Sequence, residues 1–535
     1  MNVFTRLICL AFSLLIAAGT AFAHDDAADG KGVLGKVSFA NTCAPKVQPQ
    51  LERGVAMLHS FWYSAAEETF GEILKDDPTC AIAGWGIASI LMSNPLAGAG
   101  STPKDAMKAQ AAIAEARKIG AKSERERDYI EAVAAYYQDF DTKPERARQA
   151  ARSQAYVALA SKYPGDDEAQ IFSALYMAGT QNQSDQTYSA YLKAAASLEK
   201  LFAKYPDHPG VAHYLIHSYD APPIAKQGIT AARRYASIAP AAPHAQHMPS
   251  HIFTRVGAWE DSVTTNLRSY EYAVKGNEPD EAYHASDYAV YASLQMARDA
   301  DARKIMNDAL KVTGFNPGRP TAPYAGAAMP ARLALERGDW REAMDLAPPA
   351  PPSRFLFPDA SIWYAKALGA ARAGEIAAAE KNSEQLATLH KSLLDAKNTY
   401  WATEVEVQRL TVAGWTALAK KDADNALKFM RAAADLEDKN EKHIITPGRP
   451  LPARELLADM LMELKQPAQA LKEYELSQER EPNRFRGLYG AAMAAAAAGD
   501  RAKAATYSSQ LLVLTKNADT VRPELTQVKA FIASR

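Results

Sequence analysis

QLERGVAMLHSFWYSAAEETFGEILKDDP, residues 50–78, decides the fold expected for this chain. Within it Ala66, Phe70, Ile73 and Pro78 lie at offsets 0, 4, 7 and 12. The small alanine lets two helices approach closely, and the bulky residue one turn later fills the groove beside it. Proline ends the second helix because it lacks a backbone donor and clashes with the preceding turn. The stretch therefore predicts two helices joined by a turn and closed by a proline.

The same spacing returns further along the chain. It occurs in Ala231, Tyr235, Ile238 and Pro243, and in Ala470, Tyr474, Ser477 and Pro482. This pattern resembles the tetratricopeptide repeat (TPR), a helix–turn–helix unit of 34 residues. The resemblance covers nearly all of the chain after its leader and implies an all-α fold, a TPR-like α-α superhelical solenoid. We expect about twelve helix pairs between residues 47 and 517, each burying its apolar stripe against its neighbours.

The first 23 residues have the features of a signal peptide. Arg6 supplies the positive charge, Leu7 to Ala18 form a short apolar run, and Ala21-Phe22-Ala23 gives the cleavage pattern. We expect cleavage after Ala23 and a periplasmic or secreted protein. No later segment is a candidate membrane span, because none approaches 18 uninterrupted apolar residues.

Three further expectations concern domain organisation. Residues 24–46 are predicted to be a flexible N-terminal extension. The Pro-Ala-Pro-Pro sequence at 349–352 suggests a hinge between an N-terminal solenoid, 47–348, and a C-terminal solenoid, 349–535. After export only Cys43 and Cys80 remain, and in an oxidising compartment they could form a disulfide. The alternative is that Cys80 is simply a small buried residue.

The charge of the chain bears on its partners. The formal net charge is −1 and the isoelectric point is about 6.9. Proteins that bind nucleic acid usually carry a basic surface, and the sequence has no such excess. We therefore expect no nucleic-acid partner.

Histidines concentrate in the middle of the sequence. Six of the eleven lie between His213 and His284. Three consecutive repeats are predicted to start at Ala212, Pro243 and about Tyr283. In the first repeat the second, sixth and ninth residues are His213, His217 and Asp220. In the second repeat the second, fifth and ninth residues are His244, His247 and His251. In the third repeat the same three positions are His284, Asp287 and Tyr291.

Each of these groups spans about 60° of its helix at 100° per residue, so its members share one face. In the repeat that the chain resembles, that face lines the concave groove. Six imidazoles and two aspartates would then converge on one surface. Imidazole is the commonest side-chain ligand for transition metals, and carboxylates complete such sites. We predict a site for zinc, copper or iron, with one ion or two, although polar grooves also occur without metal.

Three other residues are candidates for holding a ligand in the groove. Arg255 and Tyr291 could bind an anionic group or a peptide carboxylate, and His59 lies on the first helix of the opening repeat. A zinc protease is excluded, because Tyr214 stands where the helix carrying His213 and His217 would need a catalytic glutamate.

The segment HMPSHIF, residues 247–253, carries a second resemblance. It is similar to a group of exported bacterial TPR proteins with a histidine-rich segment. That resemblance implies the fold and the export, and it implies no reaction.

Three functions follow from these observations. The first is an exported scaffold whose concave groove binds a transition metal and a peptide, protein or small-molecule ligand. The second is a metal-dependent hydrolase or oxidase with a mono- or dinuclear histidine and aspartate site. The third is a metal-free protein-interaction scaffold. The sequence leaves open whether the chain is an enzyme.

Overall fold

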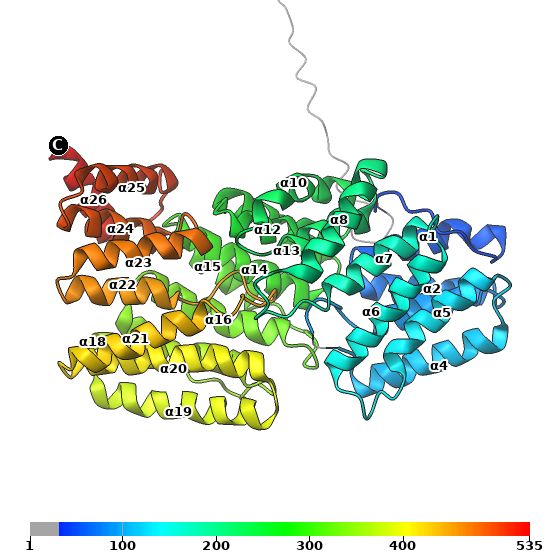
Figure 1. The fold of residues 1–535 in the computed structure, drawn as a ribbon, viewed down its shortest axis with the longest axis horizontal. Coiled ribbons are helices and arrows are strands. Elements are labelled where there is room, and N and C mark those ends of the chain that lie inside the picture. Colours follow the sequence, from blue (N-terminus) through cyan, green and yellow to red (C-terminus); the bar gives the residue numbers. More distant parts are fainter. Residues whose placement is uncertain (1–31, 99, 535) are drawn as a thin grey trace, which may run out of the picture.

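The computed structural model describes residues 32–98 and 100–534. Within those ranges the chain forms helices and loops and contains no β-strand. Consecutive helices pack side by side into one elongated array, with the early helices at the right of Figure 1 and the last ones at the left. The predicted all-α solenoid is confirmed. The predicted signal peptide lies outside the described residues.

The N-terminal part begins with a short 3₁₀ helix at Pro45–Val47. The following helices are α1 (Gln48–His59), α2 (Tyr63–Asp76), α3 (Ile82–Leu91), α4 (Pro103–Ile119), α5 (Glu124–Tyr137), α6 (Glu145–Lys162), α7 (Asp167–Ala178) and α8 (Ser189–Lys204). In the opening repeat Ala66, Phe70 and Ile73 of α2 are buried, as the spacing predicts.

The middle part contains the histidines. Its helices are α9 (Pro209–Ser218), a 3₁₀ helix at Ala225–Gly228, α10 (Ile229–Ile238), α11 (Pro243–His247), α12 (Pro249–Arg255), α13 (Trp259–Lys275), α14 (Pro279–Gln295), α15 (Asp299–Ala309) and α16 (Thr321–Glu336). The short helices α11 and α12 are one repeat helix broken at Met248, because Pro249 has no N–H to continue the ladder.

The remaining helices complete the array. They are α17 (Trp340–Asp345), α18 (Phe357–Ala373), α19 (Ile376–Asp395), α20 (Thr399–Ala419), α21 (Ala423–Glu437), α22 (Ala453–Glu463), α23 (Pro467–Arg480), α24 (Phe485–Ala497), α25 (Arg501–Leu514) and α26 (Pro523–Ala533). With α11 and α12 counted as one helix, α1 to α25 make twelve pairs in the described residues, and α26 follows them.

Apolar packing continues across the predicted hinge. Tyr324 of α16 and Phe357 of α18 belong to one buried cluster, and their rings lie 6.1 Å apart. The helices before and after residues 349–352 therefore share a core. The division into two solenoids at residue 348 stays a prediction.

The described part of the N-terminal extension packs against the array. Phe39 is fully buried and stacks on Trp85 at 5.0 Å. Cys43 and Cys80 form a disulfide, with 4.7 Å between their Cα atoms. Of the two alternatives for these cysteines, the disulfide is the one present. It ties the extension to the start of the second helix pair.

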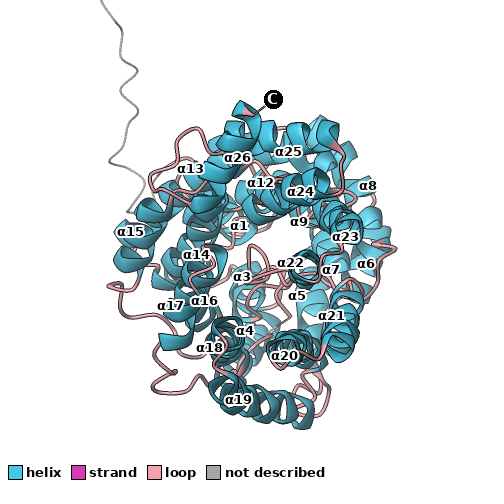
Figure 2. Cartoon of the chain, turned by 90° about the vertical axis from the view of Figure 1, so that its left-hand side faces the viewer, coloured by secondary structure: helices cyan, strands magenta, loops and turns pink. Residues whose placement is uncertain are grey.

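Residues 438–452, which join α21 to α22, run along the inner side of the array. Viewed along the long axis, the helices form a ring and loops enter its centre (Figure 2). The Glu441 N–H donates to Gln183 O at 2.9 Å, and Tyr288 Oη donates to Ile444 O at 3.1 Å. We call residues 438–452 the inner segment. It connects parts of the array that are far apart in the sequence.

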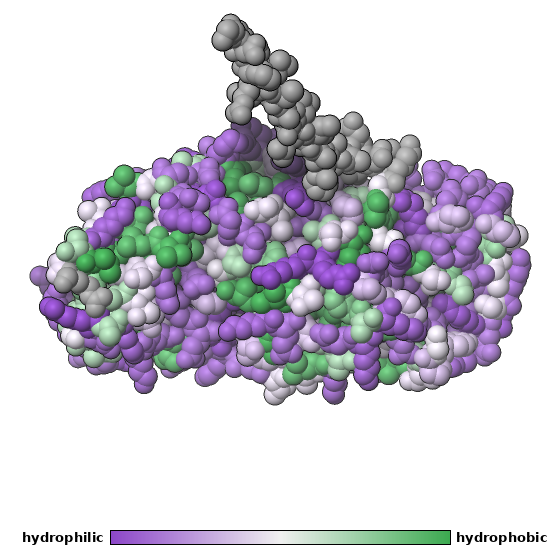
Figure 3. All heavy atoms as spheres, turned by 90° about the horizontal axis from the view of Figure 1, so that it is seen from above, coloured by the Kyte–Doolittle hydropathy of each residue, from purple (hydrophilic) through white to green (hydrophobic). Residues whose placement is uncertain are grey.

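The outer surface is mixed in character. On the face seen in Figure 3, apolar residues form several separate groups among hydrophilic ones. Large apolar side chains that are exposed include Met107 on α4 and Val513 on α25, helices at opposite ends of the array (Figure 1).

Candidate metal centre

The six clustered histidines come from consecutive repeats and converge. They are His213 and His217 on α9, His244 and His247 on α11, His251 on α12 and His284 on α14. These helices start at Pro209, Pro243 and Pro279, within four residues of the predicted repeat starts. The structure brings the histidines of these three neighbouring helices together in space.

The histidines form two groups of three. In the first triplet, His213, His217 and His244, one ring nitrogen from each residue lies within 4.8 Å of the others. The same holds for the second triplet, His247, His251 and His284. Each triplet consists of two histidines four residues apart, which share a helix face, and one from the next repeat. The array thus builds the same arrangement twice.

The two triplets touch each other. The ring centroids of His217 and His251 are 5.7 Å apart, and those of His244 and His247 are 5.8 Å apart. Distances within a triplet are similar, with 4.9 Å between His213 and His217. The six imidazoles therefore form one continuous cluster with two centres.

In the first triplet, oxygen acceptors fix two of the rings. His213 Nδ1 donates to the carbonyl oxygen of His59 at 2.7 Å, and His244 Nδ1 lies 3.2 Å from both carboxylate oxygens of Glu281. The Nε2 atoms of His213 and His244 are buried without a hydrogen-bond partner. Both ring nitrogens of His217 are also unpartnered. Three imidazoles thus have ring nitrogens free to bind a ligand.

The second triplet has the same construction. His247 Nδ1 donates to Asn266 Oδ1 at 2.7 Å, and Asn266 Nδ2 donates to Ser262 O at 2.7 Å, which fixes the amide. His251 Nδ1 donates to Asp220 Oδ2 at 2.8 Å. With both Nδ1 atoms protonated, the Nε2 atoms of His247 and His251 carry lone pairs, and they face each other at 3.0 Å.

That spacing suits a metal ion. Two lone pairs at 3.0 Å repel each other unless a cation lies between them. Two nitrogens bound to a tetrahedral metal at 2.0–2.1 Å are about 3.3 Å apart. Histidine ligands of metals usually donate their other ring N–H to a carboxylate or a carbonyl, as these four histidines do with Glu281, Asp220, Asn266 and the His59 carbonyl.

Burial favours the neutral form of several of these imidazoles, which is the form that binds metals. Desolvation, strengthened by neighbouring histidines, lowers the pKa of His213, His217 and His284 well below the ordinary value. Burial likewise lowers the pKa of His247 to about 3. These groups carry no competing proton at neutral pH.

Asp220 positions His251. Its other carboxylate oxygen accepts a hydrogen bond from Arg255 Nε at 2.8 Å and lies 3.5 Å from Lys442 Nζ. Burial by itself would raise the pKa of Asp220. The positive charges of Lys442 and Arg255 outweigh that effect and hold this pKa well below its ordinary value. Asp220, which the sequence predicts as a metal ligand, therefore orients the ring of His251. Arg255, which the sequence predicts as a ligand-binding residue, donates a hydrogen bond to Asp220.

Asp287 and Tyr291 lie outside both triplets. The Asp287 carboxylate is fully buried and accepts a hydrogen bond from Arg332 Nε at 2.8 Å. Tyr291 Oη accepts a hydrogen bond from Arg484 and donates to Glu481 at 3.2 Å. Both side chains already have ionic or hydrogen-bonded partners, so we leave them out of the candidate site.

His59 belongs to a separate buried group. Its Nε2 lies 2.9 Å from Glu168 Oε2, and Tyr214 Oη lies 2.9 Å from its Nδ1. His208 Nε2 lies 2.9 Å from the other oxygen of Glu168. The ring nitrogens of His59 are all hydrogen-bonded, unlike those of the triplets. Only its backbone carbonyl reaches the cluster, at His213.

Several residues of the cluster's surroundings were not predicted. Glu281 precedes His284 by three residues on α14, so the helical projection that identified the histidines could have found it. Asn266 lies on α13, the second helix of its repeat, and carries no signal in the sequence. The ring of Phe61 lies 4.4 Å from that of His213, and no pattern in the sequence indicates this contact.

The inner segment covers the second triplet. Tyr288 packs its ring 4.8 Å from His247, and its hydroxyl lies 3.1 Å from the carbonyl oxygens of Ile444 and Thr446. At Gly448 an added Cβ would lie 2.7 Å from Tyr291 Oη, so only glycine allows this approach. The concave surface beside the histidines is therefore occupied by the chain itself.

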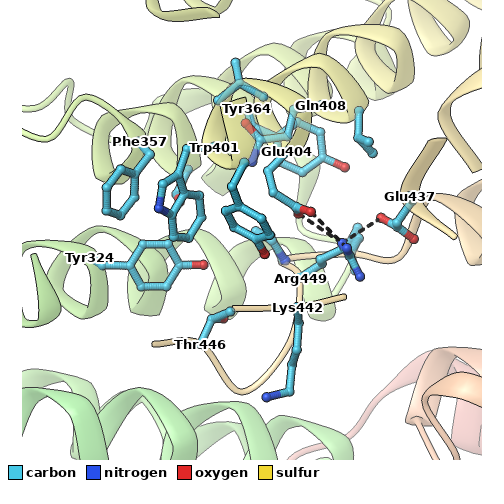
Figure 4. Close-up of a pocket in the computed structure, with 16 residues that line it drawn as sticks. Tyr324, Phe357, Tyr364, Trp401, Glu404, Gln408, Glu437, Lys442, Thr446 and Arg449 are labelled. Atoms are coloured by element: carbon cyan, nitrogen blue, oxygen red, sulfur yellow. Dashed lines mark hydrogen bonds and ion pairs between the residues drawn. The ribbon is translucent and has the colours of Figure 1, made fainter. Parts of the chain in front are cut away.

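A small pocket lies on the other side of the inner segment. In Figure 4 Arg449 faces Glu404 and Glu437, while Lys442 extends away from them. Arg449 lies 2.9 Å from Glu404 and 3.5 Å from Glu437. The Arg449–Glu404 ion pair holds the segment so that Lys442 reaches Asp220.

Comparisons with known proteins add little to this picture. No protein-family model and no curated protein matches the chain. Among solved structures, a human IFIT1 dimer with m7Gppp-AAAA matches at 12% identity and a TM-score of 0.35, covering 77% of this chain and 87% of that one. The APC/C hetero-tetramer Cut9–Hcn1 matches at 13% identity and a TM-score of 0.30, covering 91% and 96%. Likeness at this level carries no argument about ligands.

In the described residues no helix has the length and apolar character needed to cross a membrane.

Proposed function

We propose that this protein is an exported helical-repeat protein that binds a transition metal on the six clustered histidines. The observation that carries the proposal is the 3.0 Å distance between the buried Nε2 atoms of His247 and His251, whose Nδ1 atoms donate to Asn266 and Asp220. A metal ion removes their repulsion and uses a geometry that Asn266 and Asp220 hold in place. Imidazole is a preferred ligand for zinc, copper and iron.

Metal analysis of the purified mature chain tests the proposal. We expect at least one equivalent of zinc, copper or iron to remain bound after size-exclusion chromatography. A variant with His244, His247 and His251 changed to alanine should lose most of that metal. If the unmodified chain holds none after dialysis with each of the three metals, the proposal is wrong.

An enzyme is the second candidate function, and one observation favours it. Each triplet offers three protein ligands, and metal sites with three protein ligands leave a position open for water or a substrate. A hydrolase or an oxidase would use that position. Exchange-labile water on the bound metal, detected by relaxation measurements on a paramagnetic ion, would support this candidate, whereas a fully coordinated metal would contradict it.

Export is part of the proposal. The N-terminal pattern of a charged residue, an apolar run and Ala21-Phe22-Ala23 supports it, and so does the Cys43–Cys80 disulfide, which persists in oxidising compartments. The intact mass of the protein recovered from the periplasm or medium should correspond to a chain starting at His24. A full-length mass would contradict export by cleavage.

A partner could also bind the array, because concave surfaces of repeat proteins commonly hold protein segments. The inner segment already occupies that surface beside the second triplet. A peptide or protein ligand would have to use another part of the ring or displace residues 438–452. Metal binding requires neither.

A further inference from the structure

We infer that the cluster binds two copper ions, one in each triplet. This inference rests on the proposed metal binding and goes beyond it in the number and identity of the ions. It follows from the duplication of the site, from its ligand types and from the charges around it.

The duplication argues for two ions. Both triplets combine a pair of histidines four residues apart with a third from the following repeat, and neither contains a residue of the other. Each triplet also has a carboxylate that fixes one ring: Glu281 for His244, and Asp220 for His251. A single ion in the second triplet would leave buried ring nitrogens of His213, His217 and His244 without partners, at a cost in free energy. A single ion in the first triplet would leave His284 Nδ1 without a partner.

The ligand set argues for copper. All six ligands are imidazoles, and the nearby carboxylates of Asp220 and Glu281 are directed at Nδ1 atoms. Magnesium and calcium need oxygen ligands, and non-haem iron sites typically include a carboxylate. Zinc in these triplets would need a water or another group as its fourth ligand, because zinc sites are almost always four-coordinate. Cu(I) is stable with three nitrogen ligands and no fourth ligand. In the divalent state, copper binds nitrogen ligands more tightly than the other first-row metals do.

The charge of the surroundings supports monovalent ions. Two divalent ions would place four positive charges in a buried region whose nearest anions are Asp220 and Glu281. Arg255 and Lys442 already neutralise part of Asp220, at 2.8 Å and 3.5 Å. Two Cu(I) ions carry half the charge, so they suffer a smaller desolvation penalty.

The test is anaerobic loading of the full mature chain with Cu(I), followed by chromatography and elemental analysis. We expect two copper ions per chain, and X-ray absorption should report three imidazole ligands for each. His217→Leu and His284→Leu should each reduce the content from two to one, and the double variant should bind none. His217 is a suitable probe because neither of its ring nitrogens has a hydrogen-bond partner that would be stranded.

His390→Gln is the matched control. His390 lies on α19 outside both triplets, and this variant should keep two copper ions. Circular dichroism should show the same helix content in every variant. If the unmodified chain holds one copper ion, or if His217→Leu still holds two, the inference of one ion in each triplet is wrong. Metal binding by the cluster would still stand in either case. Displacement of copper by equimolar zinc would overturn the choice of metal. A chain that holds no copper, zinc or iron would overturn the proposed function as well.

Discussion

Both carboxylate oxygens of Glu281 lie 3.2 Å from His244 Nδ1, so this acidic side chain fixes the ring that completes the first triplet. The helix that carries Glu281 also carries His284 of the second triplet. One turn of α14 therefore contributes to both centres.

The first prediction concerns this contact. Glu281→Gln keeps an acceptor for His244 Nδ1 but removes the negative charge that strengthens the ring as a ligand. We expect metal affinity to fall about 10- to 100-fold, measured by competition with a chromophoric chelator. The urea midpoint should change little, which separates ring positioning from a structural role. Glu271→Gln, at an exposed position of α13, is the control. Equal affinities for both variants would contradict the role of Glu281.

The second prediction concerns Arg332, which links α14 to the inner segment. Arg332 Nη2 donates to Thr446 Oγ1 and to Gly448 O, both at 2.7 Å, and Nε pairs with Asp287. Arg332→Leu would leave Asp287 as an uncompensated buried charge. We expect a loss of about 3–5 kcal/mol in the free energy of unfolding, measured by urea denaturation.

Faster amide exchange in residues 438–452 should accompany that loss, because the segment would lose the hydrogen bonds that hold it. The control is Arg303→Leu, which removes a partly exposed pair with Glu342. That pair should contribute at most about 1 kcal/mol. If the inner segment exchanges at the same rate in Arg332→Leu as in the unmodified chain, Arg332 does not anchor it.

The third prediction concerns the disulfide between Cys43 and Cys80, which closes a loop with a sequence separation of 37. Restricting a loop of this size in the unfolded chain should contribute about 2–4 kcal/mol. Replacing both cysteines with serine should lower the urea midpoint accordingly. A reducing agent should lower the midpoint of the unmodified chain and leave the variant unchanged. If the reducing agent also lowers the midpoint of the variant, its effect on the unmodified chain does not come from breaking the Cys43–Cys80 disulfide.

The architecture and the histidine face could be predicted because both depend on local periodicity. The alanine, aromatic and proline offsets fixed the helix pairs, and their register placed histidines four residues apart on one face. His213 and His217 illustrate this, since a helix alone brings them together. The repeat then brings His244 beside them, because consecutive first helices are neighbours in a solenoid.

The remaining features depend on contacts between residues distant in the sequence. Asp287 has the same register as the histidines, but Arg332, 45 residues later, neutralises it. Tyr291 is similarly held by Arg484 from α24. The path of the inner segment follows from such ion pairs and not from its composition. No periodic pattern encodes which charges will meet.

The fourth prediction concerns Glu437, at the end of α21. Burial raises its pKa to about 8 in the folded chain, against an ordinary value of 4.5. The folded state therefore holds a proton that the unfolded state has lost between these values, so this residue lowers the free energy of unfolding as pH rises from 4.5 to 8. Glu437→Gln removes this pH-dependent contribution to the free energy of unfolding. Relative to the unmodified chain, the variant should gain at least about 1 kcal/mol between pH 5 and pH 8, measured by urea denaturation. Glu384→Gln, at an exposed position of α19, should show no such gain. A difference for Glu437→Gln that is the same at both pH values would mean that its carboxyl titrates normally in the folded chain.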